Sequence, residues 1–328
     1  MNNEQLIKEL QTKTKSVFQS LVGDCDEVPI LDFPDIKNVG DSAIWLGEVE
    51  YLKNFHGVKP GYVSTIKSYD PAVLKRMHPE GNIFIHGGGN FGDIWYGHQL
   101  FREKVMSDFP DRHIIQFPQS IHFESAEKLE KTKRAIGSHG NFSLLVRDKI
   151  SETFANEHFD CNVALCPDMA FSIGKLTPKS SVEFPVLAML REDKEINVDL
   201  VGNSTTLNNI PCEDWITENK YLVKKAKFTG YLKSASTLDQ QRCFASALHA
   251  AAENRFARGI KQISRGERII TDRLHVHICS LLLGKQHAVL DNSYRKINNF
   301  ISAFYPESEL VYRATSLNDA IDWSMRES

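Results

Sequence analysis

The chain has 328 residues, and at about 150 residues per domain this length predicts two domains and excludes a short toxin, a peptide hormone and a disordered tail. Apolar residues make up 41% and charged residues 25% of the chain, as in folded globular proteins. The 39 basic and 42 acidic side chains leave a net charge of -3, which argues against a general nucleic-acid binder.

Sequence features that direct a chain out of the cell or into a membrane are not evident. The six cysteines form no CxxC pair and show no regular spacing, so we expect reduced thiols. The N-terminal residues lack the apolar core of a signal peptide, and no stretch approaches the ~20 apolar residues that span a bilayer. No basic amphipathic stretch that would hold the chain on a membrane surface is evident either. We therefore expect a cytoplasmic protein.

The first half of the chain alternates between two kinds of apolar pattern. Leu6, Leu10, Val17 and Leu21 recur at helical spacing, which predicts an amphipathic helix over the first twenty residues. Short apolar runs that predict strands then alternate with helical patterns, at residues 28–31, 62–66, 82–86, 113–117 and 144–147. Strands that alternate with helices predict βαβ units and a parallel sheet.

A break in the periodicity predicts the domain boundary. Residues 171–185 contain Gly, Pro, Ser and Lys where the pattern pauses, as in a linker. A second series follows, with strands predicted at 186–190, 268–271 and 287–290 and helices at 238–256 and 274–283. We expect an N-terminal α/β domain at 1–175 and a C-terminal α/β domain at 184–328. The last helix, over 316–325, can pack back on the first domain.

This α/β organisation predicts where a ligand binds. Two Rossmann-like domains with parallel sheets would face a cleft at the carboxyl edges of their strands, which is where open parallel sheets bind ligands. We therefore expect the active site in that cleft.

A glycine-rich segment, HGGGNFGD, follows the strand predicted at 82–86. Gly87, Gly89 and Gly92 satisfy the GxGxxG pattern, but the next strand ends in FPQS and lacks the acidic residue that holds a ribose, so NAD binding is disfavoured. Glycines also let a ligand approach backbone amides closely.

Polar side chains flank these glycines. His86, Asn90 and Asp93 would surround an opening formed at Gly88 and Gly89, within a tight turn from strand to helix. The alternative for Asp93 is a cap of the helix that starts near residue 94. The turn 38–41 (NVGD) has the same arrangement, with Asp41 in the capping position, and would present a second helix N-terminus to the cleft.

The densest polar cluster lies in TDRLHVH, which begins at Thr271. Thr271 or Asp272 can cap the helix that follows. Arg273 and His275 would lie on different edges of a regular helix, so they can hold one ligand only if Arg273 lies in an irregular first turn. Together they would form an anion site with a proton donor. The alternative for His275 is a core histidine bonded to backbone.

Two further arginines end predicted strands. Arg147 ends the strand predicted at 144–147 and would add a cation to the carboxyl edge of the first sheet. Its alternative is a helix-start salt bridge with Asp148 or Glu152, which contributes little at a surface. Arg191 ends the strand predicted at 186–190 and is a weaker candidate.

An ordered set of segments resembles the polysaccharide pyruvyl transferase family. The segments are NVGDSAIWLGE from Asn38, HGGGNFGDIW from His86, FPQS from Phe117, VRD from Val146, TDRLHVHICSLLLGK from Thr271 and LDNSYRKI from Leu290. Each motif is unspecific alone, but their order makes the resemblance strong. It implies the architecture of B-type glycosyltransferases.

The resemblance also implies a reaction and residues that carry it. Members of the family move the pyruvyl group of phosphoenolpyruvate onto a sugar of a cell-surface polysaccharide, form a ketal and release phosphate. Arg147, Arg273, Leu274 and His275 match the donor-binding and catalytic positions. Phosphoenolpyruvate carries a phosphate and a carboxylate, which two arginines can bind with forked hydrogen bonds. We expect neither a metal nor a cofactor beyond this co-substrate.

The remaining roles follow from that chemistry. His275 is the candidate general acid, because an imidazole titrates near neutrality. Asp41, Asn90 and Asp93 would orient acceptor hydroxyls, and one of the carboxylates would take a proton. A lipid-linked acceptor would bring the enzyme to the inner membrane face. The alternatives are a glycosyltransferase that uses a nucleotide sugar and a non-catalytic subunit of polysaccharide assembly.

Overall fold

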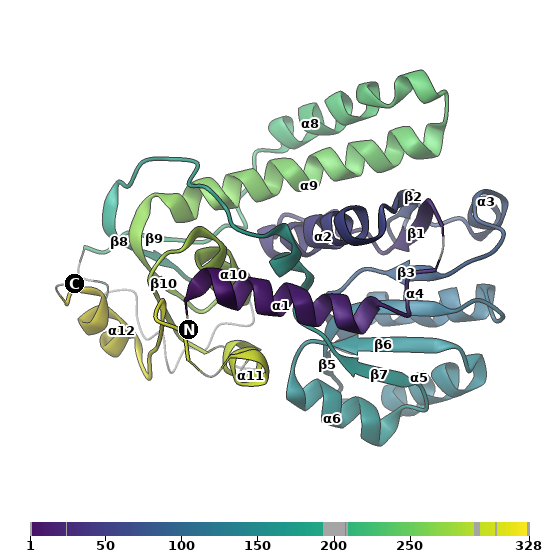
Figure 1. The fold of residues 1–328 in the computed structure, drawn as a ribbon, viewed down its shortest axis with the longest axis horizontal. Helices are drawn as coiled ribbons and strands as arrows, with labels where there is room; N and C mark the ends of the chain where they lie inside the picture. Colours follow the sequence, from purple (N-terminus) through teal and green to yellow (C-terminus); the bar gives the residue numbers. More distant parts are fainter. Residues whose placement is uncertain are drawn as a thin grey trace.

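Two parallel β-sheets, each covered by helices, form the structure (Figure 1). The computed structural model of the chain describes residues 2–23, 25–192, 207, 209–291, 296–305 and 307–326. Residues 292–295, in the middle of the LDNSYRKI segment, lie outside them. The fold confirms the predicted α/β class with two Rossmann-like parallel sheets.

The first half of the chain forms a sheet of seven strands. Its helical elements are α1 (Asn3–Phe18), α2 (Val39–Tyr51), η1 (Leu52–His56), α3 (Pro71–Met77), α4 (Tyr96–Asp108), α5 (Ala126–His139), α6 (Lys149–His158) and η2 (Met169–Ile173). Its strands are β1 (Glu27–Leu31), β2 (Lys59–Ser64), β3 (Ile83–Ile85), β4 (Gly88–Gly92), β5 (Ile114–His122), β6 (Phe142–Val146) and β7 (Asn162–Leu165). The strand order is β2-β1-β3-β5-β6-β7, and β4 pairs with β5.

The second half forms a sheet of five strands in the order β12-β11-β10-β8-β9. Its strands are β8 (Phe184–Met189), β9 (Cys212–Glu213), β10 (Gly266–Thr271), β11 (His287–Val289) and β12 (Val311–Arg313). Its helical elements are α8 (Lys220–Lys233), η4 (Ala235–Thr237), α9 (Gln240–Ser264), α10 (Leu274–Leu283), α11 (Lys296–Phe304) and α12 (Leu317–Ser324).

Each sheet reverses its winding direction at one point. The chain runs from β1 outward to β2 and then returns to β3 on the other side of β1; in the second sheet β8 and β10 have the same relation. Open parallel sheets bind ligands outside the carboxyl ends of the strands at such a switch point. The topology therefore marks the ends of β1 and β3 in one sheet and of β8 and β10 in the other.

Two helices, α1 and α9, join the two halves, and a glycine seats α2 against η2 within the first half. Leu6, Ile7 and Leu10 of α1 share a buried apolar cluster with α10, and α1 runs across the middle of the molecule (Figure 1). The long helix α9 belongs to the second half by sequence, but it packs along α2 and β2 of the first. Gly47 lets α2 lie against η2, because a Cβ there would lie 1.9 Å from the carbonyl oxygen of Met169. The two halves thus share two buried apolar clusters.

Two local predictions are wrong. The glycine segment is not a turn from strand to helix: residues 88–92 form β4, which pairs with β5. Glycine is needed there because Gly92 has a φ of +118° and a Cβ would lie 1.8 Å from the carbonyl oxygen of His122.

The last helix, α12, packs on β10, β11 and β12 of its own sheet, so the segment that crosses to the other half is α1 rather than α12.

A chain of buried side chains anchors α10 to its sheet. His277 Nδ1 lies 2.7 Å from His287 Nε2, and His277 Nε2 bonds to the hydroxyl of Tyr305. His287 Nδ1 donates to the carbonyl oxygen of Lys285 at 2.9 Å. Each ring nitrogen then has a complementary partner when both imidazoles are neutral. Burial lowers the pKa of both histidines, that of His287 to about 4.

These two histidines predict acid sensitivity of the fold. An unfolded histidine has a pKa of about 6.5, so below that pH the unfolded chain binds protons that the folded chain does not. The free energy of unfolding should therefore fall as the pH drops from about 6.5 toward 4, with His287 contributing on the order of 3 kcal/mol at the acid end. Denaturant titrations across this range should give a shallower pH dependence for His287→Asn. His122→Gln, at the surface beside Glu124, should keep the original dependence; equal slopes in both variants would contradict the assignment.

Candidate active site

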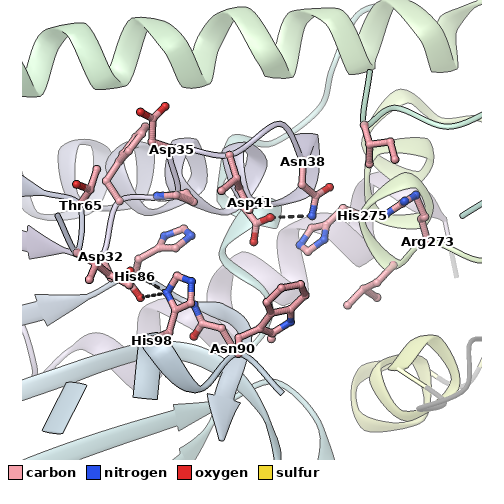
Figure 2. Close-up of a pocket in the computed structure, with 18 of the residues that line it drawn as sticks. Asp32, Asp35, Asn38, Asp41, Thr65, His86, Asn90, His98, Arg273 and His275 are labelled. Atoms are coloured by element: carbon pink, nitrogen blue, oxygen red, sulfur yellow. Dashed lines mark hydrogen bonds and ion pairs between the residues drawn. The ribbon is translucent and has the colours of Figure 1, made fainter. Parts of the chain in front are cut away.

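One cavity of about 550 Å³ lies where the two switch points face each other. Residues that follow β1, β3, β8 and β10 line this cavity, together with the N-terminus of α2 and part of α4 (Figure 2). The lining residues include Asp32, Asn38, Asp41, His86, Gly89, Asn90, Trp95, His98, Arg147, Arg191, Trp215, Arg273, Leu274 and His275. The structure thus brings residues of both halves to one hollow, where the cleft was expected.

A buried carboxylate connects two of the predicted residues. Asp168 Oδ2 lies 2.6 Å from Arg147 Nη1 and 3.2 Å from His275 Nε2. Asp168 follows β7, and its Oδ1 accepts from the amide of Ala170 at the start of η2. Although burial opposes its charge, His275 and Arg147 hold the pKa of Asp168 well below its usual range. The carboxylate therefore fixes an arginine of the first half and an imidazole of the second in one geometry.

Arg147 is buried at the edge of the first sheet. Its Nε donates to the hydroxyl of Ser120 at 3.0 Å, and its ion pair is with Asp168 rather than with Asp148 or Glu152. Asp148 instead caps α6 by accepting from the amide of Ser151 at 2.8 Å. No hydrogen bond from Arg147 Nη2 to another of the described residues is found, so this group can donate to a ligand.

Arg273 meets the geometric condition for sharing a ligand with His275. It is the N-cap residue of α10 with extended backbone angles, φ -104° and ψ 120°, so it lies outside the regular helix. Its Nη2 donates to Asp214 Oδ2 at 2.5 Å. The predicted caps are wrong: the side chain of Thr271 accepts from the amide of Arg273 at 3.0 Å, and Asp272 accepts from the amide of Arg191 at 2.9 Å.

The N-terminus of α2 lies against His275. A Cβ on Gly40 would lie 2.6 Å from His275 Nδ1, so only glycine leaves room for this ring. Asn38, and not Asp41, caps α2, because its side chain accepts from the amide of Gly40 at 3.2 Å. Asn38 also donates to Asp41 Oδ2 at 2.7 Å (Figure 2). Asp41 is thereby held in the first turn, at the cavity wall.

Two buried polar groups support the first-half wall. His86 Nδ1 lies 2.9 Å from Glu48 Oε2, and this carboxylate raises the pKa of His86 against the opposing effect of burial. Glu48 also accepts from the amide of Gly87 at 2.8 Å. Asn90 Oδ1 accepts from Arg102 and from Gln119, both at 2.9 Å. Arg102 is fully buried, and burial lowers its pKa to about 10.

Two predicted residues lie apart from this wall. The carboxylate of Asp93 accepts from the amides of Glu124 and Ser125; it neither lines the cavity nor caps α4, whose N-cap residue is Trp95. Gly88 is not among the residues that line the cavity, and a Cβ added to it would lie 3.7 Å from Asp41 Oδ1.

A second histidine and carboxylate pair in the cavity escaped the sequence analysis. His98 Nδ1 lies 2.9 Å and 2.8 Å from the two carboxylate oxygens of Asp32 (Figure 2). Asp32 is buried and has a left-handed φ of 65°, which costs an aspartate little and often accompanies function. The position of Asp32 directly after a predicted strand could have marked it as a candidate site residue. Nothing in the sequence near His98, 66 residues later, indicated that it pairs with Asp32.

Neither a three-ligand metal cluster nor a membrane-spanning helix is found in the described part of the chain. Its residues contain no group of three His, Cys, Asp or Glu side chains that could hold a metal ion. Within the same residues, no helix is long and apolar enough to cross a membrane.

Comparison with known proteins shows to which family the chain belongs. Residues 38–294 match the model of the polysaccharide pyruvyl transferases. The chain belongs to that family. It is 29% identical over 317 residues to the "Putative pyruvyl transferase EpsO" of Bacillus subtilis (strain 168), covering 92% of this chain and 95% of the relative. It is also 29% identical to "Pyruvyl transferase 1" of Schizosaccharomyces pombe, covering 84% of this chain and 68% of that one.

A solved structure supports the fold of this family member. A functionally uncharacterized protein of Klebsiella pneumoniae superposes with a TM-score of 0.55 at 18% identity, covering 96% of this chain and 100% of the other. At that identity the likeness concerns the fold alone.

The contact at Gly40 predicts the effect of one added methyl group. Gly40→Ala should displace His275 and lengthen its contact with Asp168, because a Cβ 2.6 Å from Nδ1 leaves no room for the ring. The ¹⁵N resonances of His275 should shift, and the free energy of unfolding should fall by roughly 1–3 kcal/mol. Gly137→Ala is the matched control, since a Cβ there meets nothing within 4 Å. Unchanged His275 resonances in Gly40→Ala would refute the packing described.

Proposed function

We propose that this protein transfers the pyruvyl group of phosphoenolpyruvate to two hydroxyls of a saccharide, forming a ketal and releasing phosphate. The observation that carries the proposal is the single cavity in which Arg147 of the first half meets Arg273 and His275 of the second. Membership in the family and the names of its relatives support it.

The donor end of the cavity suits a small dianion. Arg147 and Arg273 approach from different sheets, and guanidinium groups bind phosphate and carboxylate with forked hydrogen bonds. The first turns of α2 and α10 add two helix N-termini, whose amides and dipoles favour negative charge. Leu274 lines the same wall. Asp168 and Asp214 hold the two arginines in place before the ligand arrives.

The reaction needs one proton delivered and two removed. A proton must reach C3 of the enol so that C2 becomes electrophilic, and each of the two attacking hydroxyls then loses a proton. One of these two protons makes up for the proton delivered to C3, and the other leaves with phosphate. We assign the delivery to His275, whose imidazole Asp168 orients at 3.2 Å. A positioned acid of this kind contributes about 10²- to 10⁴-fold to the rate.

The acceptor end is the first-half wall. His98 is held by Asp32 at Nδ1, so its Nε2 remains as the proton acceptor. We therefore assign His98 as the base that takes a proton from an acceptor hydroxyl. Asp41, Asn90 and His86 stand on the same side of the cavity, and Trp95 is 45% exposed beside them; aromatic faces of this kind pack on sugar rings. Asp93 takes no part in this proposal, because it does not line the cavity.

The two alternative functions, a glycosyltransferase that uses a nucleotide sugar and a non-catalytic subunit, have less support from the residues of the cavity. A glycosyltransferase that uses a nucleotide sugar needs a carboxylate in the second half that is open to ribose hydroxyls. Asp214 and Asp272, which follow β9 and β10, are instead bonded to Arg273 and to backbone amides there. A subunit without catalytic activity would not need Arg147, Arg273 and His275 to line one cavity.

The decisive experiment follows phosphate release from phosphoenolpyruvate in the presence of a panel of glycosides, with mass spectrometry of the acceptor. We expect release to depend on the acceptor and the product to gain one pyruvate ketal. Turnover only with nucleotide sugars would replace the proposal with the glycosyltransferase, and inertness toward both donors would favour the non-catalytic subunit.

The donor assignment has its own variant in the same assay. Arg273→Lys should raise the KM for phosphoenolpyruvate roughly tenfold or more, because a point charge cannot reproduce the fork. Arg265→Lys is the control, since this arginine pairs with Glu183 and Glu213 away from the cavity. An unchanged KM in Arg273→Lys would remove Arg273 from the donor site.

The assignment of His98 predicts a loss in turnover without a loss in donor binding. His98→Asn and Asp32→Asn should each lower kcat by roughly 10²-fold or more, while calorimetry shows the same affinity for phosphoenolpyruvate. Asparagine suits the left-handed backbone at residue 32, so Asp32→Asn tests the carboxylate itself. His122→Gln should behave as wild type. A kcat within twofold of wild type in His98→Asn would exclude His98 as the base.

A further inference from the structure

Helix α8 carries a charge opposite to that of the chain as a whole. Its sequence, KYLVKKAKFTGYLK, contains five lysines and neither Asp nor Glu, whereas the whole chain has a net charge of -3. The sequence analysis expected no basic amphipathic stretch, whereas α8 is basic and, as its exposed side chains show, carries apolar residues on its outer face. In Figure 1, α8 forms the upper edge of the molecule and lies beside α9.

The outer face of α8 is apolar at its centre. Tyr221, Phe228 and Leu232 are 71%, 65% and 54% exposed, and at 100° per residue they share one face of the helix. The opposite face contains Val223 and Gly230, which are buried against α9. Single exposed apolar side chains are ordinary, but three on one outward stripe of one helix are not.

Lysines flank and interrupt this stripe. Lys225 lies within it, Lys224 and Lys220 lie along one side and Lys233 along the other, and all four are exposed. At the end of the helical hairpin, Leu238 is 94% exposed. A helix with an apolar stripe among lysines is the pattern of segments that lie in the plane of a membrane interface.

We propose that α8 binds the surface of an anionic phospholipid bilayer. Tyr221, Phe228 and Leu232 enter the boundary between headgroups and acyl chains, and Lys220, Lys224, Lys225 and Lys233 meet the phosphates. Charge complementarity decides for lipid over a second copy of the chain, because two α8 faces brought together would oppose lysine to lysine. Binding of this kind does not depend on the proposed reaction.

One contact connects this surface to the cavity. Lys227, on the edge of α8, lies with Nζ 2.6 Å from Oδ2 of Asp35, a residue that lines the cavity. Arg255 of α9 pairs with the same carboxylate at 3.1 Å. A bilayer under α8 would therefore hold the cavity rim beside the lipid surface, where a lipid-linked saccharide would present its sugar.

The test is co-sedimentation of the full chain with vesicles. Vesicles of phosphatidylcholine alone should bind weakly, and vesicles with phosphatidylglycerol as a third of the lipid should bind strongly, with affinity falling as salt rises. Lys224→Glu/Lys225→Glu should weaken binding by roughly 25-fold, at about fivefold per lysine removed. Phe228→Ser/Leu232→Ser should weaken it without removing the salt dependence.

The control exchanges two exposed basic residues on another helix. Lys75→Glu/Arg76→Glu on α3 changes the net charge by the same amount as the α8 charge variant, so it should bind vesicles like wild type if the surface on α8 is specific. Circular dichroism checks that each variant is folded. Equal losses in both charge variants, or no preference for anionic vesicles, would overturn the proposal. A dimer in sedimentation that Phe228→Ser/Leu232→Ser abolishes, without vesicle binding, would assign the face to a second copy instead.

Discussion

The geometry of the cavity depends on one buried carboxylate, Asp168. It is 1% exposed and accepts from Arg147 and from His275, which come from different sheets. Asp168 and Arg147 both belong to the first half, so separation of the two halves would keep their ion pair and break the contact between Asp168 and His275. The contact that orients the imidazole is thus also one that resists opening of the structure.

The two switch points explain why so many cations reach one place. Parallel strands end with their carboxyl edges together, and the helices that follow begin there, so each sheet offers helix N-termini and side chains to the same hollow. Arg147 and Arg273 each also bond to a buried or nearly buried carboxylate, Asp168 or Asp214. Those carboxylates reduce the mutual repulsion of the arginines and fix their orientation.

The sequence predicts elements well where periodicity is strong and partners are local. The predicted helix at 274–283 is α10, and the predicted strands correspond to β1, β3, β6, β8, β10 and β11 within a few residues. Arg147, Arg273 and His275 could be placed in one cleft because each follows a strand or begins a helix at a carboxyl edge. That rule needs only the order of the elements.

Contacts between distant residues are what the sequence did not reveal. Asp168 lies 21 residues from Arg147 and 107 from His275, and no local pattern reports such pairs. The run at 88–92 was interpreted as a turn, because glycines suit turns, but β5 extends far enough to pair with it. The outward apolar residues of α8 could not be predicted, because apolar residues at helical spacing predict a buried face, whereas Tyr221, Phe228 and Leu232 are exposed.

The two walls of the cavity differ in exposure, and in the proposed reaction this difference suits the two substrates. On the donor side Arg147 and Arg273 are almost completely buried and each is bonded to a carboxylate, so their geometry is fixed for one small dianion. On the acceptor side His98 and Asn90 are also bonded to buried groups, but the rim residues Ile36, Ile66 and Trp95 are 50%, 37% and 45% exposed. A fixed donor wall and an open acceptor rim allow one chemistry to serve saccharides of different shape, since substitutions at the rim leave Asp168 and its partners untouched.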